Sequence, residues 1–210
     1  MESLNPLALY SKETLEFVYT GVPIDVTYST FNRRNRYLGQ SFTKTVHGVM
    51  QEWPPASRHC VMLIQFLCKC AGVVQPKGYT RGQSFKSVHM VLLYKAAWND
   101  HLEIAKASVG AQVLYFLRWF VAFPFQKEWL TVDVDSFAVA RRSRREASGK
   151  EFGEGCHGAV IVPARASNPD YRSWNVCSNT RQPNVEMFQQ IMDELAVRCT
   201  KADGNMCGRL

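Results

Sequence analysis

The most informative stretch of the chain is WLTVDVDSFAVARRSRR, which spans Trp129–Arg145. Apolar residues alternate with polar residues over much of it, as in a strand that is buried on one face. A slip in the alternation near Ser136 is typical of a bulge or a strand end. The last five residues include four arginines, Arg141, Arg142, Arg144 and Arg145. Because the strand anchors the start of this basic run, the stretch predicts an electropositive surface at a fixed place in the fold.

The composition is that of a folded globular protein. The chain has 210 residues, of which 46% are hydrophobic and 12% aromatic, enough for one well-buried domain. Its formal charge of +7 favours encounter with polyanions such as nucleic acid or an anionic membrane surface. The cysteine count is seven, an odd number, and no amino-terminal signal peptide is visible, so we expect a reducing compartment.

Helical periodicity is clear in three segments, Ser41–Trp53, Ser57–Gly72 and Val185–Cys199. Pro54-Pro55 is expected to end the first of them. The segment Ala111–Ala122 fits either a helix or a strand, because its apolar residues match both periods.

Strand signals come from β-branched and aromatic residues. Thr14–Thr20 and Pro23–Thr30 predict a hairpin, and Ser84–Tyr94 and Ala159–Pro163 predict further strands. Together with the helices, these segments predict an α+β fold in which an antiparallel sheet packs against two or three helices.

The chain is expected to form a single domain. Residues 1–13 are predicted to be a flexible arm, residues 14–200 the globular domain and residues 201–210 a loose tail. No segment is both long enough and apolar enough to predict a membrane-spanning helix.

The candidate binding residues are arginines in two clusters. The planar guanidinium group suits bidentate contacts with phosphate, so both clusters are candidates for binding nucleic acid or acidic lipid headgroups. The predicted site consists of Arg33, Arg34, Arg36, Arg141, Arg142, Arg144 and Arg145. The alternatives are a solvated loop that keeps the protein soluble and, for Arg141–Arg145, a nuclear-import signal.

Signals for catalysis and metal binding are weak. Cys156 and His157 are neighbours in a glycine-rich loop, and a nucleophilic cysteine would need a base held within reach by the rest of the fold. Cys68 and Cys70 are two residues apart on a predicted helix, so they face different sides and do not form a metal site. The sequence therefore predicts no metal, no cofactor and no enzymatic activity, with a cysteine hydrolase as a distant alternative.

The order of the predicted elements resembles that of the rhabdovirus matrix proteins. The likeness rests on a strand near Leu15–Thr20, a helix ending at Trp53-Pro54-Pro55, an apolar helix at Val61–Cys70, strands at Val88–Tyr94 and Trp129–Ala140, and a terminal helix. Ser41-Phe42-Thr43-Lys44-Thr45-Val46 is similar to a helix start in that family, and Ala159–Ser173 is similar to a late segment.

The resemblance implies a viral structural protein that self-associates and links ribonucleoprotein to anionic membrane. Its partners would be viral ribonucleoprotein or RNA, an anionic membrane surface and further copies of itself. Its location would be the virion and the host cytoplasm or inner membrane face, with nuclear entry through Arg141–Arg145. The alternative from the basic clusters alone is a nucleic-acid-binding capsid or RNA-silencing-suppressor protein.

Overall fold

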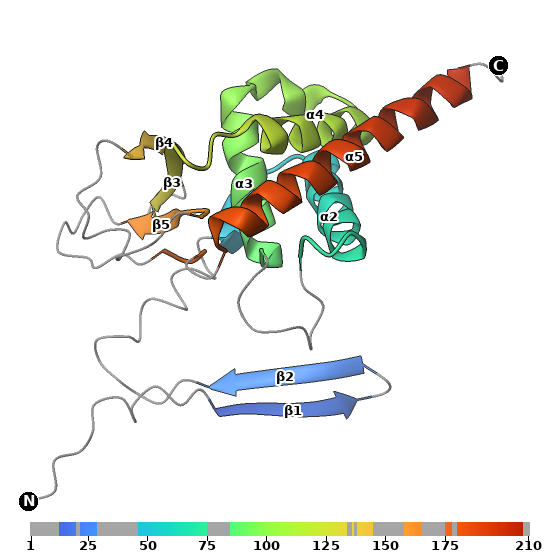
Figure 1. The fold of residues 1–210 in the computed structure, drawn as a ribbon. Coiled ribbons are helices and arrows are strands. Elements are labelled where there is room, and N and C mark those ends of the chain that lie inside the picture. The colour runs from blue at the N-terminus through green and yellow to red at the C-terminus, as the bar shows by residue number, and fades with distance from the viewer. Residues whose placement is uncertain are drawn as a thin grey trace, which may run out of the picture. The chain divides into compact units, whose positions relative to one another are not determined.

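The computed structural model describes residues 13–19, 22–28, 46–74, 85–133, 136, 138–144, 158–164, 175–177 and 180–207. Contacts within it divide the chain into two compact units, Met1–Ser41 and Phe42–Leu210. The first unit contains a hairpin, and the second contains helices and a three-stranded sheet (Figure 1). Across the described ranges, no helix combines the length and the hydrophobicity that a membrane span requires.

The first unit is an antiparallel hairpin of β1 (Glu13–Tyr19) and β2 (Val22–Tyr28). The bounds of the two predicted strands differ from these by at most two residues, so the predicted hairpin is confirmed. The register places Glu16 directly opposite Asp25.

The second unit is built on helices. The labelled helices are α2 (Pro55–Cys70), α3 (Ser87–Asp100), α4 (Val109–Ala122) and α5 (Gln182–Cys207). A short 3-10 helix, η2 (Leu102–Lys106), lies between α3 and α4, and residues 46–51 are also helical. Helix α4 contacts α2, α3 and α5, so it lies at the centre of the helical packing. One continuous apolar core includes Val49, Trp53, Ile64, Phe85, Phe116, Phe120, Phe188 and Met192.

The prediction of a strand at Ser84–Tyr94 is wrong, because residues 87–100 form helix α3. The alternating apolar residues Val88, Met90, Leu92 and Tyr94 suggested a strand, but Val91 and Leu93 between them are also buried. A helix that is buried on nearly all sides has no polar face, so its sequence does not show the helical period. The ambiguous segment Ala111–Ala122 is helix α4, and Ser108 Oγ caps it by accepting a hydrogen bond from Ala111 N at 3.3 Å.

The sheet of the second unit has the order β4-β3-β5. Its strands are β3 (Glu128–Asp133), β4 (Val139–Ser143) and β5 (Ile161–Ala164). The pair β3–β4 is antiparallel and β3–β5 is parallel, so the sheet is mixed. The predicted α+β class is confirmed.

The slip in the alternation near Ser136 marks the connection between β3 and β4. Ser136 N donates to Asp133 Oδ1 at 2.7 Å, as in a turn that an aspartate side chain stabilises. The pattern that looked like one strand is therefore a pair of antiparallel strands.

Helix α5 begins near its predicted start and continues to Cys207, eight residues beyond the predicted end at Cys199. It is fastened to α4 through Gln189. The Nε2 of Gln189 donates to Phe120 O, Val121 O and Phe123 O at 2.8–3.2 Å. These carbonyls lie at the carboxyl end of α4, where intrahelical donors run out.

A buried polar network holds three helices together around Gln112 of α4. Ser57 Oγ of α2 donates to Gln112 Oε1 at 3.1 Å, and Tyr94 Oη of α3 donates to the same oxygen at 2.5 Å. The Nε2 of Gln112 donates to Ala107 O at 2.8 Å, just before α4 begins. Since the amide is paired on both sides, burying it in an apolar core is tolerated.

His89 is a buried histidine that caps the amino terminus of α3. Its Nδ1 accepts a hydrogen bond from Lys86 N at 3.1 Å, so the ring acts as the acceptor of a capping box. Burial, assisted by the charge of Lys86, lowers the pKa of His89 to about 3, and a hydrogen bond to the Val176 backbone opposes this shift. The ring is therefore neutral in the folded protein at neutral pH.

This neutral histidine predicts acid sensitivity. Between pH 6.5 and pH 3 the unfolded chain binds a proton at His89 that the folded chain does not, so stability falls as the pH falls. For a shift of this size the loss between pH 7.5 and pH 5 is about 2 kcal/mol. We expect His89→Asn to remove this part of the pH dependence in urea titrations, whereas His59→Asn, at an exposed position, retains it. Equal pH profiles for His89→Asn and the wild type would contradict the prediction.

Candidate nucleic-acid interface

The predicted basic run lies at one end of the β3–β4 pair and lines an open pocket. Because Glu128 pairs with Ser143, the start of β3 lies beside the end of β4. The pocket has a volume of about 710 Å³. It is lined by Gln126, Lys127, Glu128, Arg141, Arg142, Ser143 and Arg144.

Strand geometry separates Arg141 from Arg142. Successive side chains of a strand point to opposite faces of the sheet. Arg141 pairs with Leu130, which belongs to the main core beneath the helices, whereas Arg142 pairs with Trp129. Trp129 packs with Val160 and Val162 in a separate cluster. The side chains of Arg141 and Arg142 therefore lie on opposite faces of the sheet.

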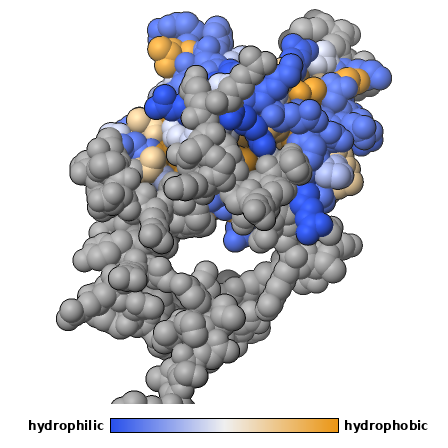
Figure 2. Space-filling model, turned by 60° about the vertical axis from the view of Figure 1, so that its left-hand side comes forward, coloured by the Kyte–Doolittle hydropathy of each residue, from blue (hydrophilic) through white to orange (hydrophobic). Residues whose placement is uncertain are grey.

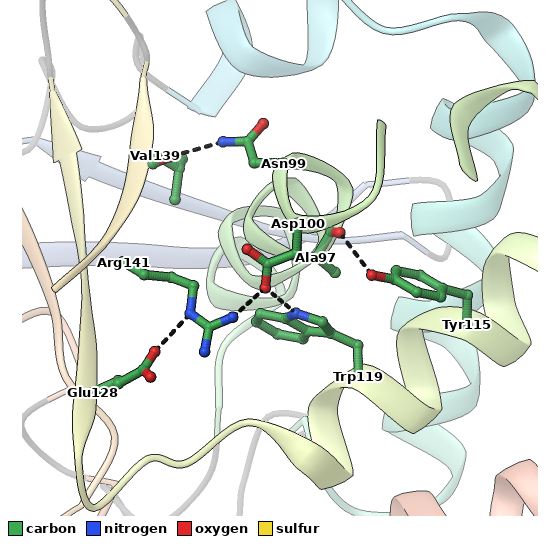
Figure 3. A network of polar contacts seen from close by, with 8 residues as sticks. All are labelled: Ala97, Asn99, Asp100, Tyr115, Trp119, Glu128, Val139 and Arg141. Atoms are coloured by element: carbon green, nitrogen blue, oxygen red, sulfur yellow. Dashed lines mark hydrogen bonds and ion pairs between the residues drawn. The ribbon is translucent and has the colours of Figure 1, made fainter. Parts of the chain in front are cut away.

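Arg141 is held by two carboxylates (Figure 3). Its Nη1 lies 2.5 Å from Asp100 Oδ2 of α3, and its Nε lies 2.6 Å from Glu128 Oε2 of β3. The hydrogen bond with Glu128 is the largest cause of the raised pKa of Arg141. With its charge balanced by two acids, Arg141 connects the sheet to α3.

Aromatic and amide side chains complete this connection. Trp119 Nε1 of α4 donates to Asp100 Oδ2 at 2.7 Å, and the guanidinium carbon of Arg141 lies 5.2 Å from the centre of the Phe123 ring. Asn99 Nδ2 donates to Val139 O at 2.8 Å, which fastens the start of β4 to α3 (Figure 3).

The other basic side chains of the pocket differ in the hydrogen bonds and ion pairs that they form. Arg144 is half-buried and donates from Nη2 to Gly158 O. Lys127 and Arg142 are exposed, and within the described ranges neither forms an ion pair. The structure thus leaves Lys127 and Arg142 as the cations of the pocket that can meet an anionic ligand.

Four of the predicted binding arginines, Arg33, Arg34, Arg36 and Arg145, lie outside the described residues, as do Cys156 and His157. Sequence reasoning missed Lys127, which directly precedes β3. The sequence signal for Lys127 was its position next to a strand that pairs with the arginine run. The role of Asp100 had no signal in the sequence, because it lies 41 residues from Arg141.

The buried cysteines have the properties of structural residues. Burial raises the pKa of Cys60 to about 12, although a hydrogen bond with Tyr94 opposes the shift, and burial alone raises the pKa of Cys68 to about 12. Both thiols are therefore protonated at neutral pH and poorly nucleophilic. The described part of the chain contains no group of three or more histidine, cysteine or carboxylate residues placed to hold a metal ion.

Comparisons of sequence give no relative. No protein-family model matches the chain, and no curated protein matches it.

Comparisons of structure give a clear fold. The polymerase core of TRAMP, an RNA surveillance complex, is 14% identical and has a TM-score of 0.64 over 92% of this chain and 60% of that chain. The structure of mtPAP in complex with UTP is 13% identical, with a TM-score of 0.57 over 90% of this chain and 43% of that chain. The structure of mtPAP in complex with CTP is 13% identical, with a TM-score of 0.56 over 95% of this chain and 45% of that chain. The chain therefore has the fold of these polymerases and spans 60% of the TRAMP core and less than half of mtPAP.

This likeness corrects the interpretation as a viral matrix protein. The structural neighbours are the polymerase core of TRAMP and mtPAP, so the resemblance to rhabdovirus matrix proteins and the virion role drawn from it are wrong. The expectation of a protein without enzymatic activity is contradicted by the same neighbours, which are enzymes. RNA as a partner is compatible with the fold, whereas no comparison supports a membrane or a second copy as a partner.

The ion pairs of Arg141 predict a difference between neighbouring arginines. Arg141→Met leaves Asp100 and Glu128 without their shared cation, so we expect a loss of about 1–2 kcal/mol in the free energy of unfolding. Arg142→Met removes an exposed side chain and is expected to change this free energy by about 0.5 kcal/mol or less. Urea denaturation of the two variants measures the difference. Equal losses would show that the carboxylates do not hold Arg141 in solution.

Proposed function

We propose that this chain acts in nucleotidyl transfer to RNA. The observation that carries the proposal is the fold, which matches the polymerase core of TRAMP over 92% of the chain. Other neighbours of this fold are mtPAP structures bound to GTP, UTP, CTP and ATPγS. The formal charge of +7 fits a protein whose substrate is a polyanion.

Lys127 and Arg142 have the chemistry to bind the RNA backbone. Both are exposed cations on one pocket, and phosphate contacts of this kind position RNA without reading its sequence. The ion pairs of Arg141 fix β4, so the backbone that carries Arg142 is held in place before RNA arrives. A preorganised cation loses less conformational freedom on binding than a mobile one.

Two carboxylate residues of the hairpin are candidates for the chemistry. Nucleotidyl transfer uses divalent cations to neutralise developing phosphate charge, and carboxylates hold such cations. The register places Glu16 of β1 directly opposite Asp25 of β2. On residue type and backbone register, Asp25 and Glu16 are the carboxylates that we take as candidates to hold Mg²⁺.

Primer extension tests the transfer activity. The chain is incubated with Mg²⁺, a 5′-labelled oligo(A) of about 15 nucleotides and each nucleoside triphosphate in turn. We expect extension products for at least one triphosphate and a loss of about 100-fold or more for Asp25→Asn. Glu13→Gln, a carboxylate on β1 that pairs with Tyr28, is the matched control and is expected to retain activity. A folded chain that binds the oligonucleotide but extends it with none of the four triphosphates would contradict the proposal.

Salt titration tests the RNA contacts separately. Each phosphate contact with single-stranded RNA contributes about −0.7 to the slope of log affinity against log salt. We expect the double variant Lys127→Ala with Arg142→Ala to make this slope shallower by about 1.4. Arg198→Ala, on an exposed arginine of α5, is expected to leave the slope unchanged. An unchanged slope in the double variant would exclude the pocket from the RNA interface.

A further inference from the structure

Helix α2 presents an apolar stripe to solvent. Met62 and Phe66 are each 61% exposed, and Leu63 is 40% exposed. The residues at 62 and 66 are one helical turn apart, so they lie on the same side of the helix. The opposite side of α2 is buried in the main core through Cys60, Val61, Ile64 and Cys68.

Among the described residues, the other exposed large apolar side chains include Leu102, Met187 and Val197, which lie on η2 and α5. On the face shown in Figure 2 the described residues are mainly hydrophilic, and hydrophobic side chains form small separate patches. Single exposed apolar residues are normal on a folded protein, whereas adjacent large ones mark interaction surfaces. Three large apolar side chains next to each other on one helix therefore call for a partner.

The charged residues of α2 itself have one sign. Helix α2 contains no aspartate or glutamate, and exposed cations lie near its two ends at Arg58 and Lys69. Within the described ranges neither cation forms an ion pair. The two positions are separated by about 16 Å along the helix axis, because each residue advances the helix by 1.5 Å. The apolar stripe lies between them.

We propose that the exposed face of α2 is the docking surface for an amphipathic helix of an acidic partner protein. The apolar side of the partner helix covers Met62, Leu63 and Phe66, and carboxylates near its two ends meet Arg58 and Lys69. This mode of recognition places a helix against a groove or face through residues one turn apart. The proposal is independent of nucleotidyl transfer, because the α2 face shares no residue with the β3–β4 pocket.

Charge decides between this occupant and others. Two copies of the chain meeting through α2 would bring Arg58 and Lys69 of one copy against the same cations of the other, which disfavours self-association. RNA would satisfy the two cations and could stack a base on Phe66, but it would leave the aliphatic side chains of Met62 and Leu63 without an apolar partner. An acidic amphipathic helix satisfies both the apolar stripe and the cations.

The test uses two designed helical peptides of about 18 residues labelled with a fluorophore. Both carry leucines every three to four residues, and one carries glutamates at both ends where the other carries lysines. Fluorescence anisotropy with the full chain measures their affinities. We expect the acidic peptide to bind at least about tenfold more tightly than the basic peptide.

Variants of exposed residues assign the binding to α2. The double variant Met62→Ser with Phe66→Ser is expected to weaken binding of the acidic peptide by at least about tenfold. Leu102→Ser, at a 66% exposed apolar residue of η2, is the matched control and is expected to leave the affinity unchanged. Arg58→Glu with Lys69→Glu is expected to reverse the preference, so that the basic peptide binds more tightly.

Four results would overturn the proposal. One is equal affinity for the two peptides, and another is an unchanged affinity in the Met62→Ser, Phe66→Ser variant that retains the wild-type circular dichroism spectrum. The third is competition, in which an oligo(A) RNA displaces the acidic peptide from wild-type chain, since the α2 face would then be an RNA site. Sedimentation velocity adds a fourth arm, because a dimer that the serine variant abolishes would identify a second copy as the occupant.

Discussion

The guanidinium group of Arg141 is the contact on which the arrangement of sheet and helices depends. It brings together carboxylates from α3 and β3, and it lies over the Phe123 ring just beyond α4. A partly buried carboxylate without a cation is costly, so Asp100 and Glu128 each gain from the same side chain. Because this arginine is fixed toward the helices, strand alternation directs Arg142 to the other face. The position of the positive charge of Arg142 in the pocket therefore depends on the structural ion pairs of Arg141.

Local signals predicted a good part of the fold. The hairpin, the stop at Pro54-Pro55, the strand character of Trp129–Ala140 and the carboxyl-terminal helix all follow from propensity, periodicity and breakers within a few residues. Helix α3 was missed because a nearly fully buried helix lacks the polar face that reveals its period. The α+β class follows from the local signals, whereas the mixed sheet depends on β5 pairing in parallel across a long connection.

The binding residues were predictable only in part. The sequence indicated where positive charge concentrates, but it gave no way to know that Asp100 and Glu128 neutralise Arg141 while Lys127 and Arg142 have no such partner within the described ranges. Pairing of this kind is decided by tertiary structure. The mistaken family had a related cause: the order of helices and strands together with their hydrophobicity is shared by many unrelated folds, and function belongs to sites within them.

The buried amide of Gln112 determines which packing of the helices is adopted rather than how stable that packing is. A rotation of α2 by one residue would turn Ser57 through about 100° and leave the amide oxygen with an empty acceptor position. An apolar core tolerates such sliding, since one methyl group replaces another with little loss. Hydrogen bonds from Ser57 and Tyr94 to a single oxygen do not tolerate it, because their geometry is specific. The three helices are thereby restricted to one mutual alignment, and alternative packings of the same apolar surfaces are disfavoured.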